Sequence, residues 1–146
     1  RQPRRWEIDA FKAFLELEYL TIADVENLVN AFQRGAKLRD KHGMDVWIGG
    51  VQKFGMPEVR ENLKTIIWKA NSYKTDRKHY KRNPQIGRAE GVMPWQVHIE
   101  YEHLHPFMDG NGRSGRAIWA WMHSGQSIEF IRGFLHSFYY ETLMNN

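Results

Sequence analysis

The segment HPFMDGNGRSGR, residues 105–116, gathers side chains that could act together on a phosphate. An imidazole such as that of His105 titrates near neutral pH and could serve as a general base. Asp109 offers the hard carboxylate oxygen that Mg²⁺ prefers. Arg113 and Arg116 would project from neighbouring positions of a helix, where both could bind a polyphosphate. The segment therefore predicts a site that binds a nucleotide's phosphates close to a base.

The glycines of this segment indicate how such a site would be built. Gly110 and Gly112 flank Asn111 and would let the backbone take conformations that other residues avoid, so that successive N–H groups converge on phosphate oxygens. We expect a helix to begin at about Gly112, which would add the positive end of its dipole. Two arginines in the first turn of a helix oppose that dipole and repel each other. Local stability would not favour them there unless an anion lies between them.

Two known loop motifs, one that binds phosphate and one that binds calcium, do not match the sequence of this segment. A Walker loop needs a lysine and then Ser or Thr after the second glycine, where this chain has Arg113. A calcium loop that begins at the aspartate needs an oxygen ligand at Arg113, a glycine at Ser114 and a glutamate at Ala120. Neither motif is present.

Two other interpretations of the segment stay open at this point. His103, His105 and Asp109 form a His-x-His pattern followed by an acid, which is a recurrent ligand set for zinc or iron. The second interpretation is purely structural, since the acid-glycine and amide-glycine pairs could simply make tight turns between helices.

The elements that must position these residues are expected to be helices. Apolar residues recur at three- and four-residue spacings over residues 5–20 and 21–34, with Thr21 as the N-cap of the second helix. Further helices are predicted from Pro57 to about residue 70, from Pro94 to the His105–Pro106 break, from about Gly112 onward, and over residues 127–138. The polar, basic residues 71–93 are predicted to form a long surface connection.

Residues 44–57, MDVWIGGVQKFGMP, change from the helical pattern to that of a hairpin. Val46 and Ile48 alternate with other positions, and Gly49 and Gly50 suit a tight turn with positive φ. We therefore expect a small β-hairpin before the third helix.

Length and composition are those of one globular domain. The chain has 146 residues, of which 42% are hydrophobic, 14% aromatic and 26% charged, with a net charge of +4. This modest positive charge specifies no polyanionic partner, and we do not expect nucleic acid to be the ligand. No cysteine, signal peptide or apolar run of membrane-spanning length is present, so a cytoplasmic protein without a membrane partner is expected, or one delivered into a host cell. Because it begins with Arg1, the chain is expected to be processed or part of a longer protein.

HPFMDGNGRSGR resembles the signature of the Fic (filamentation induced by cAMP) family, H-P-F-x-[D/E]-G-N-G-R-x-x-R, and fills every fixed position. Upstream, His98, Tyr101 and Leu104 fall where members tend to have a histidine, an aromatic and an aliphatic residue. The hairpin at 44–57 is similar to the family's flap, which adds a strand to the backbone of the target. The resemblance is strong over 94–123. It implies an all-α, Fic-like helical domain with a small β-hairpin flap, spanning 1–146 as a single domain.

The resemblance also implies an activity and a role for each residue of the motif. Most members move AMP from ATP to a hydroxyl of a target protein, with Mg²⁺. Carried over by position, His105 would take the proton from a Ser, Thr or Tyr hydroxyl, Phe107 would anchor the loop, and Asp109 would ligate Mg²⁺ between the α- and β-phosphates. Gly110, Asn111 and Gly112 would form the anion hole, Arg113 would contact the β-phosphate, and Arg116 the γ-phosphate.

Alternatives remain for the activity and for its control. The same fold could transfer another nucleotide or a phosphate, or the chain could be a non-catalytic module that binds nucleotides or nucleic acid. Members are often restrained by a helix of pattern [S/T]-x-x-x-E-[G/N], which residues 22–27 and 137–142 each miss at one position. Glu26 and Glu141 are interpreted as solvated helix residues. Any restraint is expected to come from a separate antitoxin or from another part of a longer chain.

Overall fold

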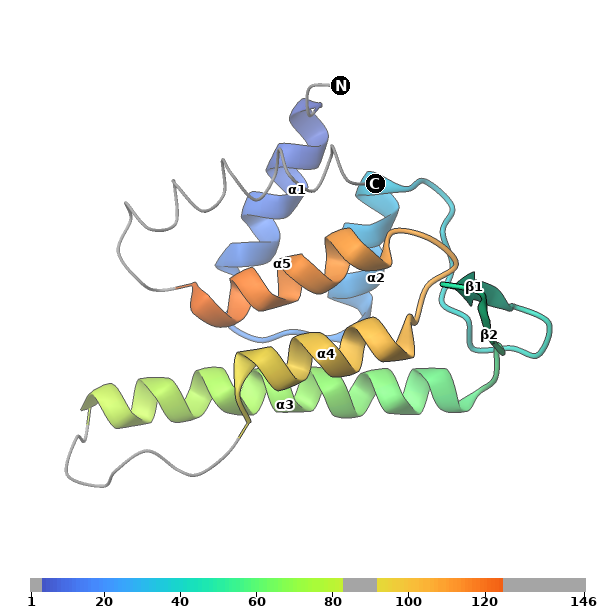
Figure 1. The fold of residues 1–146 in the computed structure, drawn as a ribbon. Coiled ribbons are helices and arrows are strands. Elements are labelled where there is room, and N and C mark those ends of the chain that lie inside the picture. The colour runs from blue at the N-terminus through green and yellow to red at the C-terminus, as the bar shows by residue number, and fades with distance from the viewer. Residues whose placement is uncertain (1–3, 83–91, 125–146) are drawn as a thin grey trace.

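The computed structural model describes residues 4–82 and 92–124 of the chain, and in that part it is helical with one small hairpin. In chain order the elements are α1 (Arg5–Glu16), α2 (Ile22–Phe32), β1 (Val46–Ile48), β2 (Val51–Lys53), α3 (Glu58–Arg82), α4 (Pro94–Leu104) and α5 (Asn111–His123). The predicted all-α fold with a β-hairpin is confirmed (Figure 1). The helix predicted over 127–138 lies outside the described residues.

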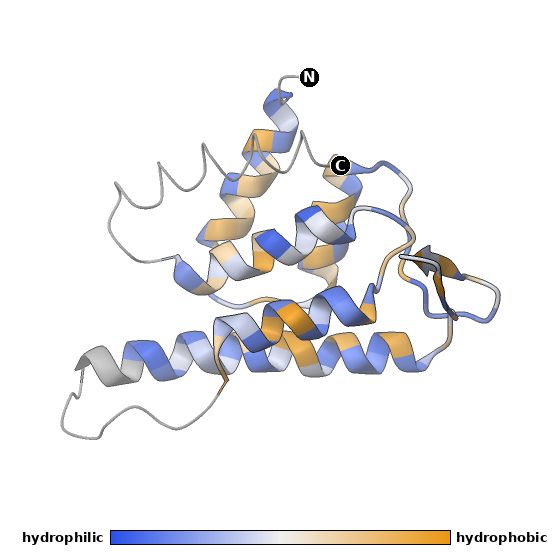
Figure 2. Ribbon diagram, in the orientation of Figure 1, coloured by the Kyte–Doolittle hydropathy of each residue, from blue (hydrophilic) through white to orange (hydrophobic). Residues whose placement is uncertain are grey.

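Helix α5 lies at the centre of the fold and packs against α1, α2, α3 and α4 (Figure 1). Its last turns are apolar and contribute Ile118, Trp121 and Met122 to the buried core. Figure 2 shows that the N-terminal part of the same helix is hydrophilic. Asn111 and Ser114 in that part are nevertheless buried. Polar residues are thus buried at the N-terminal end of a core helix. We therefore expect the functional site at this end.

The first two helices and their connection agree with the sequence except at one boundary. Thr21 caps α2 as predicted, since its hydroxyl accepts from the Asp24 N–H while the Asp24 carboxylate accepts from the Thr21 N–H. The first helix ends at Glu16 and does not reach residue 20. Tertiary contacts account for this, because Leu17 is extended and its carbonyl accepts a 2.7 Å hydrogen bond from the indole of Trp121.

Helix α3 is longer than predicted. The sequence indicated an end near residue 70 and a surface connection over 71–93, but the helix continues to Arg82. Long-range contacts support a segment that has no apolar period of its own. Asn71 donates to the carbonyl of Leu20 at 2.9 Å and accepts from its N–H at 2.8 Å. The predicted solvated loop is therefore wrong for residues 71–82.

Two cations of α3 hold the C-terminal end of α5. Lys74 Nζ donates to the Ser124 hydroxyl at 2.5 Å and lies 4.1 Å from the centre of the Trp121 ring. Arg77 donates to the carbonyls of Met122 at 3.1 Å and Ser124 at 2.8 Å. Cations at this end complement the helix dipole. Burial, more than the neighbouring cations, lowers the pKa of Lys74 to about 8.

The predicted hairpin is present, and its turn has the predicted chemistry. Strands β1 and β2 are antiparallel, with Val46 opposite Lys53 and Ile48 opposite Val51. The turn residues Gly49 and Gly50 have φ of 54° and 82°, which a tight hairpin turn with two left-handed positions requires. The hairpin lies at the same end of the molecule as the connection between α4 and α5 (Figure 1).

Within residues 4–82 and 92–124, none of the helices combines the length and hydrophobicity that a membrane span requires.

Candidate active site

His105 lies at a sharp exit from α4. Its N–H still donates to the Tyr101 carbonyl at 2.9 Å, but its backbone is left-handed, with φ 51° and ψ 61°. It is the one non-glycine position with positive φ among the described residues. The following Pro106 disfavours a further helical residue here, as the sequence predicted. Backbone conformations of this kind cost energy and are concentrated at functional sites.

The imidazole of His105 is partly buried, and its environment favours the neutral form. Burial is the main cause that lowers its pKa, and the cations of Arg39 and Lys53 lower it further. The carbonyl of Glu102 and the carboxylate of Asp109 act in the opposite direction. Nδ1 is buried. A neutral imidazole with one nitrogen available to a substrate is the form that a general base needs.

The loop between α4 and α5 is closed by one amide side chain. Asn111 Oδ1 accepts from the N–H of Phe107 at 2.8 Å, and Asn111 Nδ2 donates to the carbonyl of Phe107 at 2.7 Å. Both residues are buried, Phe107 completely, and Phe107 also forms an isolated β-bridge with Leu38. The side chain of Asn111 is therefore occupied within the loop. If this residue contributes to an anion hole, it does so through its main-chain N–H.

The N-terminus of α5 has no side-chain cap. Gly110 is the N-cap, with φ 78°, and no side chain caps the helix. The Ser114 N–H makes a 3.1 Å bond to the Gly110 carbonyl. The preceding amides, of residues 111–113, are those that an α-helix leaves without intrahelical partners. The helix begins one residue before the predicted position. A left-handed backbone is needed at Gly110 only, since Gly112 lies inside the helix, so the expected special conformation at Gly112 is wrong.

Arg113 is buried beside these amides and is only partly satisfied. Its Nη2 reaches the side-chain oxygen of Gln33 at 3.4 Å, and its guanidinium carbon lies 5.4 Å from the centre of the Phe32 ring. Its Nε and Nη1 are buried and have no hydrogen-bond partner. Buried donors without partners are rare and costly. Two such atoms on one cation could donate to the oxygens of an anion.

Gln33 joins Asp109 to Arg113, and sequence reasoning missed it. Its amide nitrogen donates to Asp109 Oδ2 at 2.6 Å while its oxygen faces Arg113. Asp109 Oδ1 accepts from the Gly110 N–H at 2.8 Å, and Asp109 is exposed. Each carboxylate oxygen keeps a second lone pair for a ligand. The one signal in the sequence was the position of Gln33 directly after the apolar stripe of α2.

A comparison with protein families agrees with this geometry. Residues 93–123 match the model of the Fic/DOC family. The matched segment, called the Fic motif below, begins one residue before α4 and ends with α5. No curated protein and no solved structure matches the chain.

The Fic motif depends on a close approach between α4 and α5. The hydroxyls of Tyr101 and Ser114 lie 2.6 Å apart, and Ser114 donates to the Gly110 carbonyl at 2.8 Å. Complete burial raises the pKa of Tyr101 well above its usual value. A Cβ at Gly115 would lie 2.9 Å from Cδ1 of the Tyr101 ring. The two helices can therefore meet only where residue 115 has no side chain.

The Fic motif does not form the alternative metal site. Among the described residues, no three His, Cys, Asp or Glu side chains come together in a way that could hold a metal ion. His103 is exposed at the last turn of α4. A magnesium ion needs no such cluster, because one carboxylate, substrate phosphates and water can complete its coordination. Asp109 fits that requirement. Arg116, the last residue of the signature, lies partly buried in α5.

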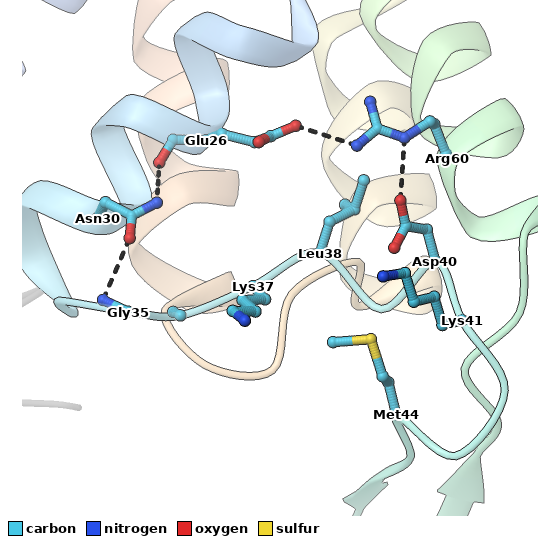
Figure 3. A pocket seen from close by; sticks show the side chains of 10 residues that line it. Glu26, Asn30, Gly35, Lys37, Leu38, Asp40, Lys41, Met44 and Arg60 are labelled. Atoms are coloured by element: carbon cyan, nitrogen blue, oxygen red, sulfur yellow. Dashed lines mark hydrogen bonds and ion pairs between the residues drawn. The ribbon is translucent and has the colours of Figure 1, made fainter.

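An open pocket lies between α2, the segment 35–44 and α3 (Figure 3). None of the residues that line it belongs to the Fic motif. At its wall Arg60 reaches Asp40 at 3.0 Å and Glu26 at 3.4 Å. Glu26 is thus partly exposed and paired with Arg60. Glu141, the other candidate for an inhibitory glutamate, lies outside the described residues.

Proposed function

We propose that this protein transfers AMP from ATP to a Ser, Thr or Tyr hydroxyl of a target protein, with Mg²⁺. The match to the Fic/DOC family, whose members commonly transfer nucleotide groups to proteins, supports the class of reaction. The observation that carries the proposal is the buried guanidinium of Arg113, which has two nitrogens without hydrogen-bond partners beside the uncapped N-terminus of α5. Such a site favours a polyanion near His105.

In the proposed reaction the His105 imidazole accepts the proton of the target hydroxyl through Nε2, because Nδ1 is buried. The hydroxyl oxygen forms a bond to the α-phosphorus, and the bond from that phosphorus to the oxygen bridging to the β-phosphate breaks. Pyrophosphate leaves with the bridging oxygen and its negative charge. A histidine base of this kind contributes about 10²- to 10⁴-fold to the rate.

The other motif residues would hold charge in place during this transfer. The main-chain amides at the start of α5 would donate to the phosphate oxygens, and Arg113 and Arg116 would neutralise the leaving pyrophosphate. Asp109 would hold the magnesium ion, which supplies further charge neutralisation when bound. Gln33 keeps the Asp109 carboxylate oriented through its 2.6 Å bond. Positioning and neutralisation, rather than covalent chemistry, would provide most of the rate enhancement.

A labelling experiment tests the proposal. The protein is incubated with Mg²⁺, a lysate of candidate targets, and ATP that carries its label in the α- or in the γ-phosphate. We expect the α-label to become attached to protein, to disappear with His105→Ala, and to remain with His103→Ala, a matched histidine two positions away on the exposed side of α4. Transfer of the γ-label alone would instead support a phosphate transferase. ATP binding that survives His105→Ala, without transfer by the unaltered protein, would support a non-catalytic module.

A further inference from the structure

Arg39 joins three parts of the chain through one buried side chain. It follows α2 and precedes the hairpin, and its relative exposure is 1%. Its guanidinium donates to four main-chain carbonyls: Nε to His105 at 2.7 Å, Nη2 to Leu104 at 2.9 Å, and Nη1 to Met44 at 3.3 Å and Lys53 at 3.2 Å. Two of these carbonyls belong to the exit of α4, one lies just before β1, and one lies at the end of β2.

We propose that Arg39 is a positioning residue of the transfer reaction, which fixes the main chain of His105 and the hairpin in a common frame. The inference rests on the function proposed above, in which His105 accepts the proton of the target hydroxyl. It adds that the hairpin, which lies at the same end of the molecule as the α4–α5 connection, is the element that meets the target. Proton transfer requires that acceptor hydroxyl and base meet within hydrogen-bond distance. A side chain bonded to both parts sets their relative position before the target arrives.

The main chain around Arg39 already attaches this segment to the catalytic loop. The Arg39 N–H donates to the Pro106 carbonyl at 2.8 Å, and the Arg39 carbonyl accepts from the Met56 N–H at 3.1 Å. The Met108 N–H donates to the Lys37 carbonyl at 2.9 Å. These bonds do not involve the guanidinium. Replacing the side chain therefore removes the alignment of His105 with the hairpin while it leaves the backbone attachment in place.

The contacts at the end of α4 explain why an arginine is needed. The last carbonyls of a helix lack intrahelical partners and carry its negative dipole end, and His105 lies there in a left-handed conformation. Only a planar guanidinium offers donors in several directions from one fixed group. A lysine at residue 39 would keep the charge but would present its donors from a single nitrogen. It could not span the carbonyls of His105 and of both hairpin arms.

The experiment compares Arg39→Lys and Arg39→Gln with the control Arg77→Lys. Arg77 also donates to the carbonyls at a helix end, but at the far end of α5. Affinity for ATP is measured by calorimetry and the transfer rate at saturating ATP. We expect both Arg39 variants to lower the rate about 10²-fold, since a displacement of about 1 Å has that effect, with little change in ATP affinity. The control is expected to keep the rate. An unchanged rate in the Arg39 variants, or a loss that parallels weaker ATP binding, would overturn the proposal.

A second measurement separates this inference from the proposed function. In the protein without ATP, NMR reports the amide resonances of His105, Met44 and Lys53. We expect all three to shift together in the Arg39 variants and to stay in place in Arg77→Lys, whether or not the protein transfers AMP. A protein that transfers nothing but shows this pattern would refute the transfer reaction and keep the structural coupling. Resonances that do not move together would refute the coupling. If both Arg39 variants unfold, Arg39 serves the fold as a whole and the inference is also wrong.

Discussion

The cost of burying Arg113 without an anion can be measured directly. Arg113→Met keeps the length and the apolar contacts of the side chain but removes its charge. The substitution thereby removes two buried nitrogens, Nε and Nη1, that have no hydrogen-bond partner. The losses are a long hydrogen bond of 3.4 Å to Gln33 and a ring contact with Phe32 at 5.4 Å. The protein without nucleotide should therefore become more stable when this arginine is replaced.

The magnitude follows from these contacts. Each of the two buried unsatisfied donors costs about 1–3 kcal/mol, while the long hydrogen bond to Gln33 contributes about 1 kcal/mol and the ring contact about 0.5–1 kcal/mol. We expect Arg113→Met to raise the free energy of unfolding by about 1–3 kcal/mol. Magnesium ATP at about 100 times its Kd should stabilise the unaltered protein by about 2.7 kcal/mol. It should stabilise the variant far less.

Urea denaturation with and without magnesium ATP tests both effects. Arg60→Met is the control, because Arg60 forms only partly exposed ion pairs with Glu26 and Asp40. Its loss should cost at most about 1 kcal/mol and leave the effect of ATP unchanged. The reasoning would be refuted if Arg113→Met were less stable than the unaltered protein without nucleotide, or if ATP stabilised both equally.

Three further outcomes follow from the site and its supports. The acid limb of kcat/KM, which reports the protein without nucleotide, should have its midpoint below the usual imidazole value of about 6.5, because burial lowers the pKa of His105. A kcat/KM profile with a midpoint above that value contradicts the assignment. Gly115→Ala should lower the free energy of unfolding by about 1–3 kcal/mol, since its Cβ would meet the Tyr101 ring. Chemical denaturation measures this, and a variant more stable than the unaltered protein would show that α4 and α5 can separate at little cost. Lys74 has a pKa of about 8 in the folded protein against an ordinary value of 10.5, so it binds fewer protons there than in the unfolded chain. Its contribution to stability therefore rises as pH increases from 8 to 10.5, and urea midpoints of Lys74→Met should lack this rise; an equal rise in both proteins would contradict it.

The sequence predicted the elements that carry their own local signals. Thr21, Pro94 and the pair Gly49-Gly50 each act on the nearest backbone, so the start of α2, the start of α4 and the hairpin turn were all predicted correctly. Residues 71–82 carry no such signal. Their helix depends on contacts made by Asn71 and other side chains with distant segments, and an apolar period cannot reveal contacts of that kind.

The candidate site divides in the same way. Its central residues lie within one contiguous motif and could be named from spacing alone. Gln33 and Arg39 reach that motif from a segment more than sixty residues away in sequence, as the separations of 76 and 66 positions to Asp109 and His105 show. Apart from the position of Gln33 directly after the apolar stripe of α2, nothing in the sequence sets these two residues apart from ordinary surface residues. Only the folded arrangement shows that they bond to the Asp109 carboxylate and to the His105 carbonyl.

The two hydrogen bonds between Asn111 and Phe107 have a consequence for the signature itself. A carboxylate at residue 111 could accept from the Phe107 N–H but could not donate to its carbonyl, and a hydroxyl is too short to reach both. An amide is the smallest side chain that satisfies the two groups together. Asn111 is therefore required by the architecture of the loop. We expect a descendant that has lost catalysis but kept the loop to retain this asparagine.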